Sequence, residues 1–196
     1  MPKRVIVEGE KKLILDDFFK VEEVHLSFEK FDGSMSPVVR RLNFERGDSV
    51  AAVLHQKQRD VVILVNQFRY PAYDKGPGWL TEVVAGMIDK GEHPEAAMRR
   101  EILEETGYVV ENLVHIADFY VSPGGSSERI FLYCAEISGL DPAGKGGGLA
   151  SENEDIQLVE LSTGEAFARL ERGEIQDAKT IIALMWLRTR LVSGVS

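Results

Sequence analysis

The segment from His93 to Gly107 constrains the fold most narrowly, because it carries both a start and a stop signal for one helix. Pro94 suits the first helical position, and Glu95 complements the positive end of the helix dipole. Gly107 stands where a left-handed C-terminal cap is expected. The pattern predicts a helix that runs from Pro94 to Thr106, with strand-like segments before and after it.

Runs rich in β-branched and apolar residues flank this helix. Before it, Val50 to Leu54 and Val61 to Val65 lie on either side of a polar turn, which predicts a hairpin. After it come the strand-like runs Leu113 to Tyr120, Ile130 to Ile137 and Ile156 to Leu161, and then helical periodicity in Thr163 to Glu171 and Asp177 to Leu191. Strands and helices in this order predict an α/β or α+β sandwich, in which helices cover a mixed sheet.

The N-terminal part of the chain is expected to form a small unit of its own. Between Leu13 and Phe44, alternating stretches bracket the turn dipeptide Asp32-Gly33, which predicts two or three antiparallel strands. So small a sheet is only marginally stable alone, and it should pack on the rest of the chain or on a second copy of itself. We therefore divide the chain into residues 1–46, which are expected to take part in dimerisation, and a main domain over residues 47–196.

Composition excludes several other classes of protein. The formal charge is −9, from 23 basic and 32 acidic residues, so neither nucleic acid nor an anionic membrane is an expected partner. No apolar run reaches the ~18–20 residues that cross a bilayer, and no signal peptide is recognisable. The single Cys134 cannot form an internal disulfide, and the four histidines lack zinc-finger spacing. A reducing cytoplasm is the expected location.

Three acidic residues share one stripe of the predicted helix. At 100° per residue, Glu101, Glu104 and Glu105 fall within an arc of about 100°, between flanks that look buried. Like charges at this spacing repel, more strongly in drier surroundings, so a cation should lie nearby, and Arg100 can neutralise only one of them. Oxygen ligands in this number suit magnesium or manganese. The alternative is a solvated acidic face without a ligand.

The residues around this stripe resemble the Nudix box, the signature of the Nudix hydrolases. The matching fixed positions are Gly86, Glu92, Arg100, Glu101, Glu104, Glu105 and Gly107. Tyr108 departs from the pattern, which prefers an aliphatic residue there. The resemblance implies the Nudix α/β/α sandwich with a mixed sheet, and it implies metal-dependent hydrolysis of a nucleoside diphosphate linked to another moiety.

Segments outside the box resemble the ADP-ribose pyrophosphatase group of this superfamily. They include Pro123, sixteen residues after Gly107, and the runs Gln67-Phe68-Arg69 and Glu152-Asn153-Glu154-Asp155. The implied reaction is the magnesium-dependent cleavage of ADP-ribose to AMP and ribose 5-phosphate. A sister group that acts on GDP-mannose shares many of these features, so hydrolysis of GDP-mannose or of a broader set of nucleoside diphosphate sugars is the alternative. A module that senses ADP-ribose without cleaving it is a second alternative, against which the intact box argues.

The resemblance also implies roles for individual residues. The implied metal ligands are Ala85, through its carbonyl oxygen, Glu101, Glu105 and Glu154. Glu104 either binds metal or orients its neighbours, and Arg100 holds the carboxylates in place. Glu152 is the implied catalytic base, and its glycine-rich surroundings suit a group that must admit substrate before it reaches the attacking water.

Substrate contacts are expected from two further groups of residues. Contacts to phosphate, ribose or base are expected from Phe18, Phe19, Arg41, Arg46, Arg69 and Met87. A wall that faces the terminal ribose is expected from Ser122, Pro123, Gly124 and Glu128. If Arg41 and the phenylalanines come from the partner subunit, as the resemblance implies, the active sites are shared across a homodimer. Without the resemblance, the phenylalanines fit a core equally well, and Arg41 and Arg46 fit surface ion pairs.

Overall fold

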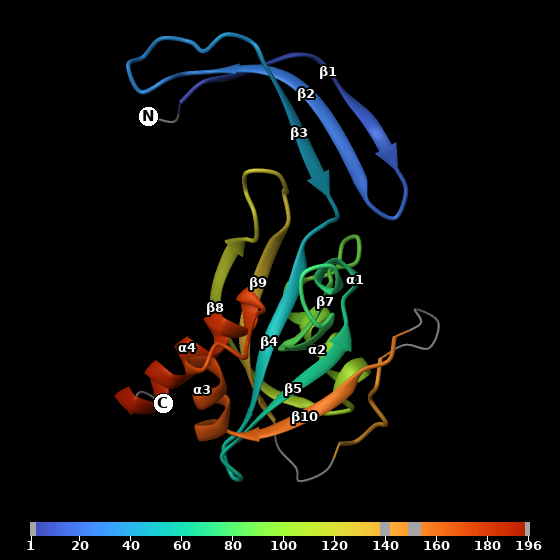
Figure 1. Cartoon of the computed structure of the whole chain (residues 1–196), viewed down its shortest axis with the longest axis vertical. Coiled ribbons are helices and arrows are strands. Elements are labelled where there is room, and N and C mark those ends of the chain that lie inside the picture. The colour runs from blue at the N-terminus through green and yellow to red at the C-terminus, as the bar shows by residue number, and fades with distance from the viewer. Residues whose placement is uncertain (1–2, 138–141, 149–153, 195–196) are drawn as a thin grey trace. The chain divides into compact units, whose positions relative to one another are not determined.

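The computed structural model describes residues 3–137, 142–148 and 154–194 (Figure 1). The chain forms two compact units. One comprises Met1–Asp48 with Phe119–Arg129, and the other comprises Ser49–Asp118 with Ile130–Ser196. The segment Phe119–Arg129 therefore joins the N-terminal unit although it lies far from it in sequence.

The N-terminal unit is built on a three-stranded antiparallel sheet. Its strands are β1 (Val5–Asp16), β2 (Lys20–Phe28) and β3 (Val39–Glu45), in that order across the sheet. The dipeptide Asp32-Gly33 lies between β2 and β3, where a turn was expected, and Gly33 adopts the positive φ of 83° that such a turn requires. The sheet begins earlier in the chain than expected. The sequence of β1 does not alternate regularly and its pairing with β2 shifts register twice, so the two-residue period is absent.

The segment Phe119–Arg129 is attached to this sheet through its last strand. The Phe44 amide donates to the Gly125 carbonyl at 2.8 Å, and the Asn43 side chain donates to the Ser127 hydroxyl at 3.1 Å. The Ser127 hydroxyl in turn donates to the Glu45 carboxylate. The expected ribose-facing segment and the strand that ends at Glu45 therefore belong to one unit.

The main unit is organised around a seven-stranded mixed sheet. Its strands are β4 (Ser49–Gln56), β5 (Val61–Phe68), β6 (Trp79–Glu82), β7 (Val84–Met87), β8 (Val110–Tyr120), β9 (Arg129–Ile137) and β10 (Gln157–Ser162). The principal order is β10-β5-β4-β9-β8, while β6 pairs with β5 and β7 pairs with β4. The expected hairpin is confirmed as the antiparallel pair β4–β5, and β4 is parallel to β9.

Helices cover this sheet. They are α2 (Pro94–Thr106), α3 (Thr163–Glu171) and α4 (Ala178–Ser193), and all three lie where the sequence predicted them. The helix α2 begins as expected, with the His93 ring accepting from the Glu95 amide, and ends at Gly107 with a φ of 73°. In α4, the side chain of Asp177 caps the first turn by accepting from the Thr180 amide.

The strand β4 is buried at every position, because helices lie against both of its faces. Val50, Ala52 and Leu54 share one core cluster with Met98 and Ile102 of α2. The intervening residues of β4 point the other way, since side chains alternate across a strand, and α4 contacts β4 while α3 contacts β5 and β10. The expected α/β sandwich with a mixed sheet is confirmed.

Three short elements were not predicted from the sequence: β6, β7 and the single turn α1 (Tyr70–Tyr73). Each has four residues, which is too short for hydrophobic periodicity to identify. The strands β6 and β7 exist because β5 and β4 supply their hydrogen-bond partners. Within the described part of the chain, no helix is long and apolar enough to cross a membrane.

Candidate active site

The three glutamates of α2 lie in different environments. Glu105 is almost completely buried, with 2% of its surface exposed, and it lies next to the buried residues Ile102 and Thr106. Glu101 is mostly buried, and Glu104 is more open. The stripe is therefore not the solvated acidic face of the alternative interpretation, since one of its carboxylates is withdrawn from water.

Arg100 holds the more accessible carboxylates from the side. Its Nη1 donates to Glu101 at 2.6 Å and to Glu104 at 3.1 Å. Its Nη2 donates to Glu92 at 3.0 Å and to the Met87 carbonyl at 3.1 Å. The hydrogen bond from Arg100 is the main reason why the pKa of Glu92 lies below its ordinary value. One guanidinium thus links Glu92, β7 and two carboxylates of α2, which fixes their relative positions.

Gly86 allows the backbone of β7 to approach the carboxylates. A Cβ at this position would lie 1.9 Å from Glu101 Cδ and 2.2 Å from each of its carboxylate oxygens. The backbone of β7 therefore lies directly against the Glu101 side chain at Gly86. The neighbouring Ala85 forms a backbone hydrogen bond to the carboxyl group of Glu105. Because residue 86 has no side chain, β7 can lie directly beside Glu101 and Glu105.

Burial makes the charge of Glu105 unfavourable without a cation. Desolvation, with the charges of Glu101 and Glu154, raises the pKa of Glu105 to about 9, while Arg69 and the Ala85 amide act in the opposite direction. Burial likewise raises the pKa of Glu101. Among the described residues, nothing donates a hydrogen bond to Oε2 of Glu105. A buried carboxylate oxygen without a partner, next to two more carboxylates, is suited to a hard divalent cation.

The described side chains do not form a preorganised metal site. Among residues 3–137, 142–148 and 154–194, no three His, Cys, Asp or Glu side chains are grouped closely enough to hold an ion together. The carboxylates repel one another, and Glu101 is instead drawn towards Arg100. The donor set nevertheless fits a divalent metal in its chemistry, because carboxylate oxygens are ligands that hard cations prefer.

A glycine-rich segment brings Glu154 to the same end of α2. The amide of Gly147 donates to the Glu105 carbonyl at 2.7 Å, and that of Gly148 donates to the Glu104 carbonyl at 3.3 Å. A Cβ on Gly148 would lie 2.5 Å from Glu154 Oε2. The last carbonyls of the helix are thereby satisfied, and the segment lies close to the Glu154 side chain. The expected catalytic base, Glu152, lies outside the described residues.

Two of the expected substrate-binding residues lie in the main unit. Arg69 follows β5, and its charge opposes the rise in the pKa of Glu105, so its guanidinium is close to the carboxylates. Two nitrogens of Arg69 donate to Glu82. Met87 is 39% exposed, while its carbonyl accepts from Arg100. Glu82 was not predicted from the sequence, because no motif marks it and its partners, Arg69 and Lys179, are distant in the chain.

The other expected substrate-binding residues lie in the N-terminal unit. They are Phe18, Phe19, Arg41, Arg46, Ser122, Pro123, Gly124 and Glu128. Phe19 packs on Phe44 with the ring centroids 4.9 Å apart, whereas Phe18 is 80% exposed. Arg46 lies over the Phe19 ring and forms an ion pair with Glu128 at 3.6 Å. The structure therefore brings Phe19, Arg46 and Glu128 together.

Arg41 is not part of that group. Its Nη1 donates to the Arg40 carbonyl at 3.0 Å, and the residue is exposed on β3. In Ser122-Pro123-Gly124, the carbonyl of Ser122 accepts from the amides of Gly125 and Ser126, which makes this segment a tight turn.

Comparisons with known proteins support the resemblance to the Nudix box. A family model of the NUDIX domain matches residues 45–184. The ADP-ribose pyrophosphatase of Escherichia coli (strain K12) is 40% identical over 172 residues, which are 87% of this chain and 82% of that protein. The GDP-mannose pyrophosphatase of Pectobacterium atrosepticum is 38% identical over 177 residues, which are 89% of this chain and 90% of that protein.

A similar fold is found in a solved structure described as an ADP compounds hydrolase. Its TM-score to this chain is 0.74, with 21% sequence identity, and the match covers 100% of this chain and 97% of that one. At this identity the likeness concerns the fold alone. The family model and the curated relatives, however, extend over most of the chain and include the clustered glutamates of α2. This chain therefore belongs to the NUDIX domain family, the Nudix hydrolases.

Proposed function

We propose that this protein hydrolyses the diphosphate of ADP-ribose to AMP and ribose 5-phosphate, with Mg²⁺ as its cofactor. The observation that carries the proposal is the buried carboxylate oxygen Oε2 of Glu105, which has no hydrogen-bond partner among the described residues and lies beside Glu101 and Glu154 and close to Arg69. Nudix hydrolases generally use a divalent metal, and the relatives that are 40% identical are named for ADP-ribose, whereas those named for GDP-mannose are 34–38% identical.

The metal would be held by Glu101, Glu105, Glu154 and the Ala85 carbonyl. When bound, it would neutralise diphosphate oxygens and lower the pKa of a coordinated water. Mn²⁺ has the same preference for carboxylate oxygen and is the alternative ion. Arg100 keeps Glu101 and Glu104 in place before substrate arrives.

Glu152 is the proposed catalytic base. In this role its carboxylate accepts a proton from the attacking water as the water oxygen bonds to phosphorus. The bond between that phosphorus and the bridging oxygen breaks, and the bridging oxygen leaves with the other phosphate. The products are AMP and ribose 5-phosphate, so one water is consumed per molecule of ADP-ribose.

We also propose that residues 1–46 contribute substrate contacts and a dimer interface, and that residues 47–196 form the hydrolase domain. Every residue of β1 is exposed, and six of them are large and apolar: Val5, Ile6, Val7, Leu13, Ile14 and Leu15. An apolar strand of this length favours a partner surface, which we propose is a second copy of the chain. Light scattering should give the mass of a homodimer. A monomer at all protein concentrations would contradict this part of the proposal.

A substrate panel tests the reaction. Purified protein with Mg²⁺ is incubated separately with ADP-ribose, GDP-mannose and NADH at equal concentration, and the products are separated by ion-exchange chromatography. We expect preferred turnover of ADP-ribose. Preferred turnover of GDP-mannose would replace the proposal by its main alternative, which the relative in Pectobacterium atrosepticum favours. Binding of ADP-ribose without metal-dependent cleavage would instead favour a sensing module.

A cytoplasmic location is also part of the proposal. Cys134 is a free, buried cysteine, as is usual in a reducing compartment. Fractionation of cells that express the untagged protein should recover it with cytoplasmic markers. Recovery with the membrane or secreted fraction would contradict the assignment.

A further inference from the structure

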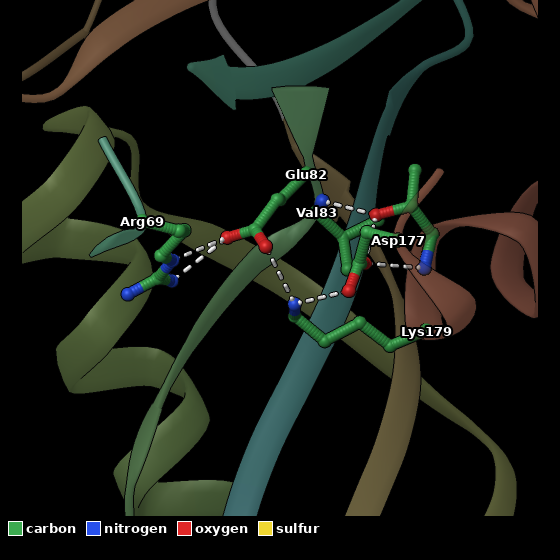
Figure 2. Close-up of polar contacts among 6 residues, drawn as sticks. Arg69, Glu82, Val83, Asp177 and Lys179 are labelled. Atoms are coloured by element: carbon green, nitrogen blue, oxygen red, sulfur yellow. Dashed lines mark hydrogen bonds and ion pairs between the residues drawn. The ribbon is translucent and has the colours of Figure 1, made fainter. Parts of the chain in front are cut away.

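Arg69 is a partly exposed cation that is held by a buried anion. Its Nε and Nη2 donate to the same oxygen of Glu82, Oε2, at 3.0 and 2.7 Å. Glu82 lies at the end of β6 and is 4% exposed, whereas the Arg69 side chain is 39% exposed. Figure 2 shows the third guanidinium nitrogen of Arg69 pointing away from Glu82. One edge of the guanidinium is therefore occupied, while Nη1 is directed elsewhere.

Glu82 is itself fixed by residues from the start of α4. Its other oxygen, Oε1, lies 3.3 Å from Lys179 Nζ, and Lys179 also contacts Asp177 at 2.7 Å. Asp177 accepts from the amide and the hydroxyl of Thr180, and the Thr180 hydroxyl accepts from the Val83 amide at 2.8 Å. Figure 2 marks these contacts with dashed lines. Glu82 thus has little freedom to move, and neither does the guanidinium that it holds.

This group lies directly beside the carboxylate site. Val83 immediately precedes β7, whose Ala85 and Gly86 contact the glutamates of α2. The charge of Arg69 also acts on Glu105. A buried ion pair is weak evidence for stability, because desolvation of both charges offsets much of their attraction. It does restrict the geometry of its members, and a fixed arginine suits recognition of a phosphate group.

We propose that Glu82 is a positioning residue, which holds the Arg69 guanidinium so that Nη1 meets the diphosphate of the substrate. This inference rests on the proposed function, but it requires only the diphosphate, which ADP-ribose and GDP-mannose share. Because Arg69 is oriented before substrate arrives, the ordering of a long side chain does not have to accompany binding. Lys179 and Asp177 support Glu82 and do not touch substrate.

The first test is the variant Glu82→Gln, assayed with the nucleotide sugar that the wild type turns over best. Glutamine keeps the size of the side chain and removes the charge that aligns Arg69. We expect KM to rise about tenfold with a much smaller change in kcat, since ground-state binding is weakened. The matched control is Glu160→Gln in β10, which removes the carboxylate that pairs with two nitrogens of Arg59. Its KM should equal that of the wild type.

A double-mutant cycle shows whether Glu82 acts through Arg69. Arg69→Ala should raise KM at least as much as Glu82→Gln does. The KM of the double variant should be no higher than that of Arg69→Ala alone. Independent effects that multiply in the double variant would overturn the proposal, as would an unchanged KM in Glu82→Gln. If Arg69→Ala has the KM of the wild type, the proposed substrate contact of Arg69 is itself wrong. That outcome differs from failure of the proposed function, in which the wild type cleaves no nucleotide sugar.

Arg69→Lys keeps the proposal testable if Glu82→Gln does not fold. Lysine retains the positive charge but cannot donate from two nitrogens to Glu82 while it presents a third. We expect its KM to approach that of Arg69→Ala. A KM equal to that of the wild type would show that an aligned guanidinium is not needed, and it would overturn the proposal. Thermal unfolding of each variant separates this effect from loss of fold.

Discussion

Replacement of Gly86 by alanine should separate folding from activity. Gly86 lies in β7 and does not adopt a positive φ, so alanine adds no backbone strain there. The added Cβ would lie 1.9 Å from Glu101 Cδ. To reach an ordinary van der Waals separation, the Glu101 carboxyl group would have to move by about 1.5–2 Å. The displaced group is the end of a flexible side chain, so the free energy of unfolding should change by only about 1 kcal/mol or less.

The effect of Gly86→Ala on catalysis should be much larger. A displacement of 1 Å in a catalytic site can lower the rate about 100-fold, so kcat should fall by about 100-fold or more. The assay is turnover of ADP-ribose at saturating Mg²⁺, with thermal unfolding measured on the same samples. Gly164→Ala in α3 is the control, because a Cβ there meets nothing within 4 Å and its φ is not positive. Wild-type turnover in Gly86→Ala would refute the claim that Glu101 must stay beside the backbone of β7.

Three further predictions concern other residues. Glu152→Gln should lower kcat by about 10²–10⁴ with little change in metal binding, measured by titration calorimetry, and ordinary turnover would mean that the base lies elsewhere. Burial lowers the pKa of His55, so the unfolded chain takes up a proton as the pH falls below about 6.5 while the folded protein resists it. The free energy of unfolding should therefore decrease from pH 7.5 to 5.5, and His55→Gln should flatten that decrease in urea titrations; an unchanged slope would contradict this. Burial raises the pKa of Cys134 to about 12, so at pH 8 the thiol should react far more slowly in folded than in urea-unfolded protein, and equal rates would refute its burial.

The parts of the fold that were predictable are those with local signals. The helix α2 carries its own start and stop residues, and the hairpin β4–β5 joins two apolar runs through a short turn. The position of Glu101, Glu104 and Glu105 on one stripe of α2 follows from helical spacing alone. The motif also marks Gly86 from the sequence, but only the structure places β7 against those carboxylates.

The missed features depend on contacts between distant parts of the chain. The strands β6 and β7 have four residues each, and they are defined by pairing with β5 and β4 rather than by their own sequence pattern. Glu82 contacts Lys179 and Arg69, and no spacing rule connects these three residues. Sequence could mark Arg69 as a ligand-binding residue, but it could not show which group orients its guanidinium.

The central claim is that Glu101 and Glu105 hold a divalent cation at the scissile diphosphate. The most direct measurement is a crystal structure with Mn²⁺ and a non-hydrolysable ADP-ribose analogue, in which anomalous scattering locates the ion. We predict an anomalous peak within bonding distance of both carboxylates and of the analogue's diphosphate. A bound analogue whose diphosphate and metal lie away from Glu101 and Glu105 would contradict the account.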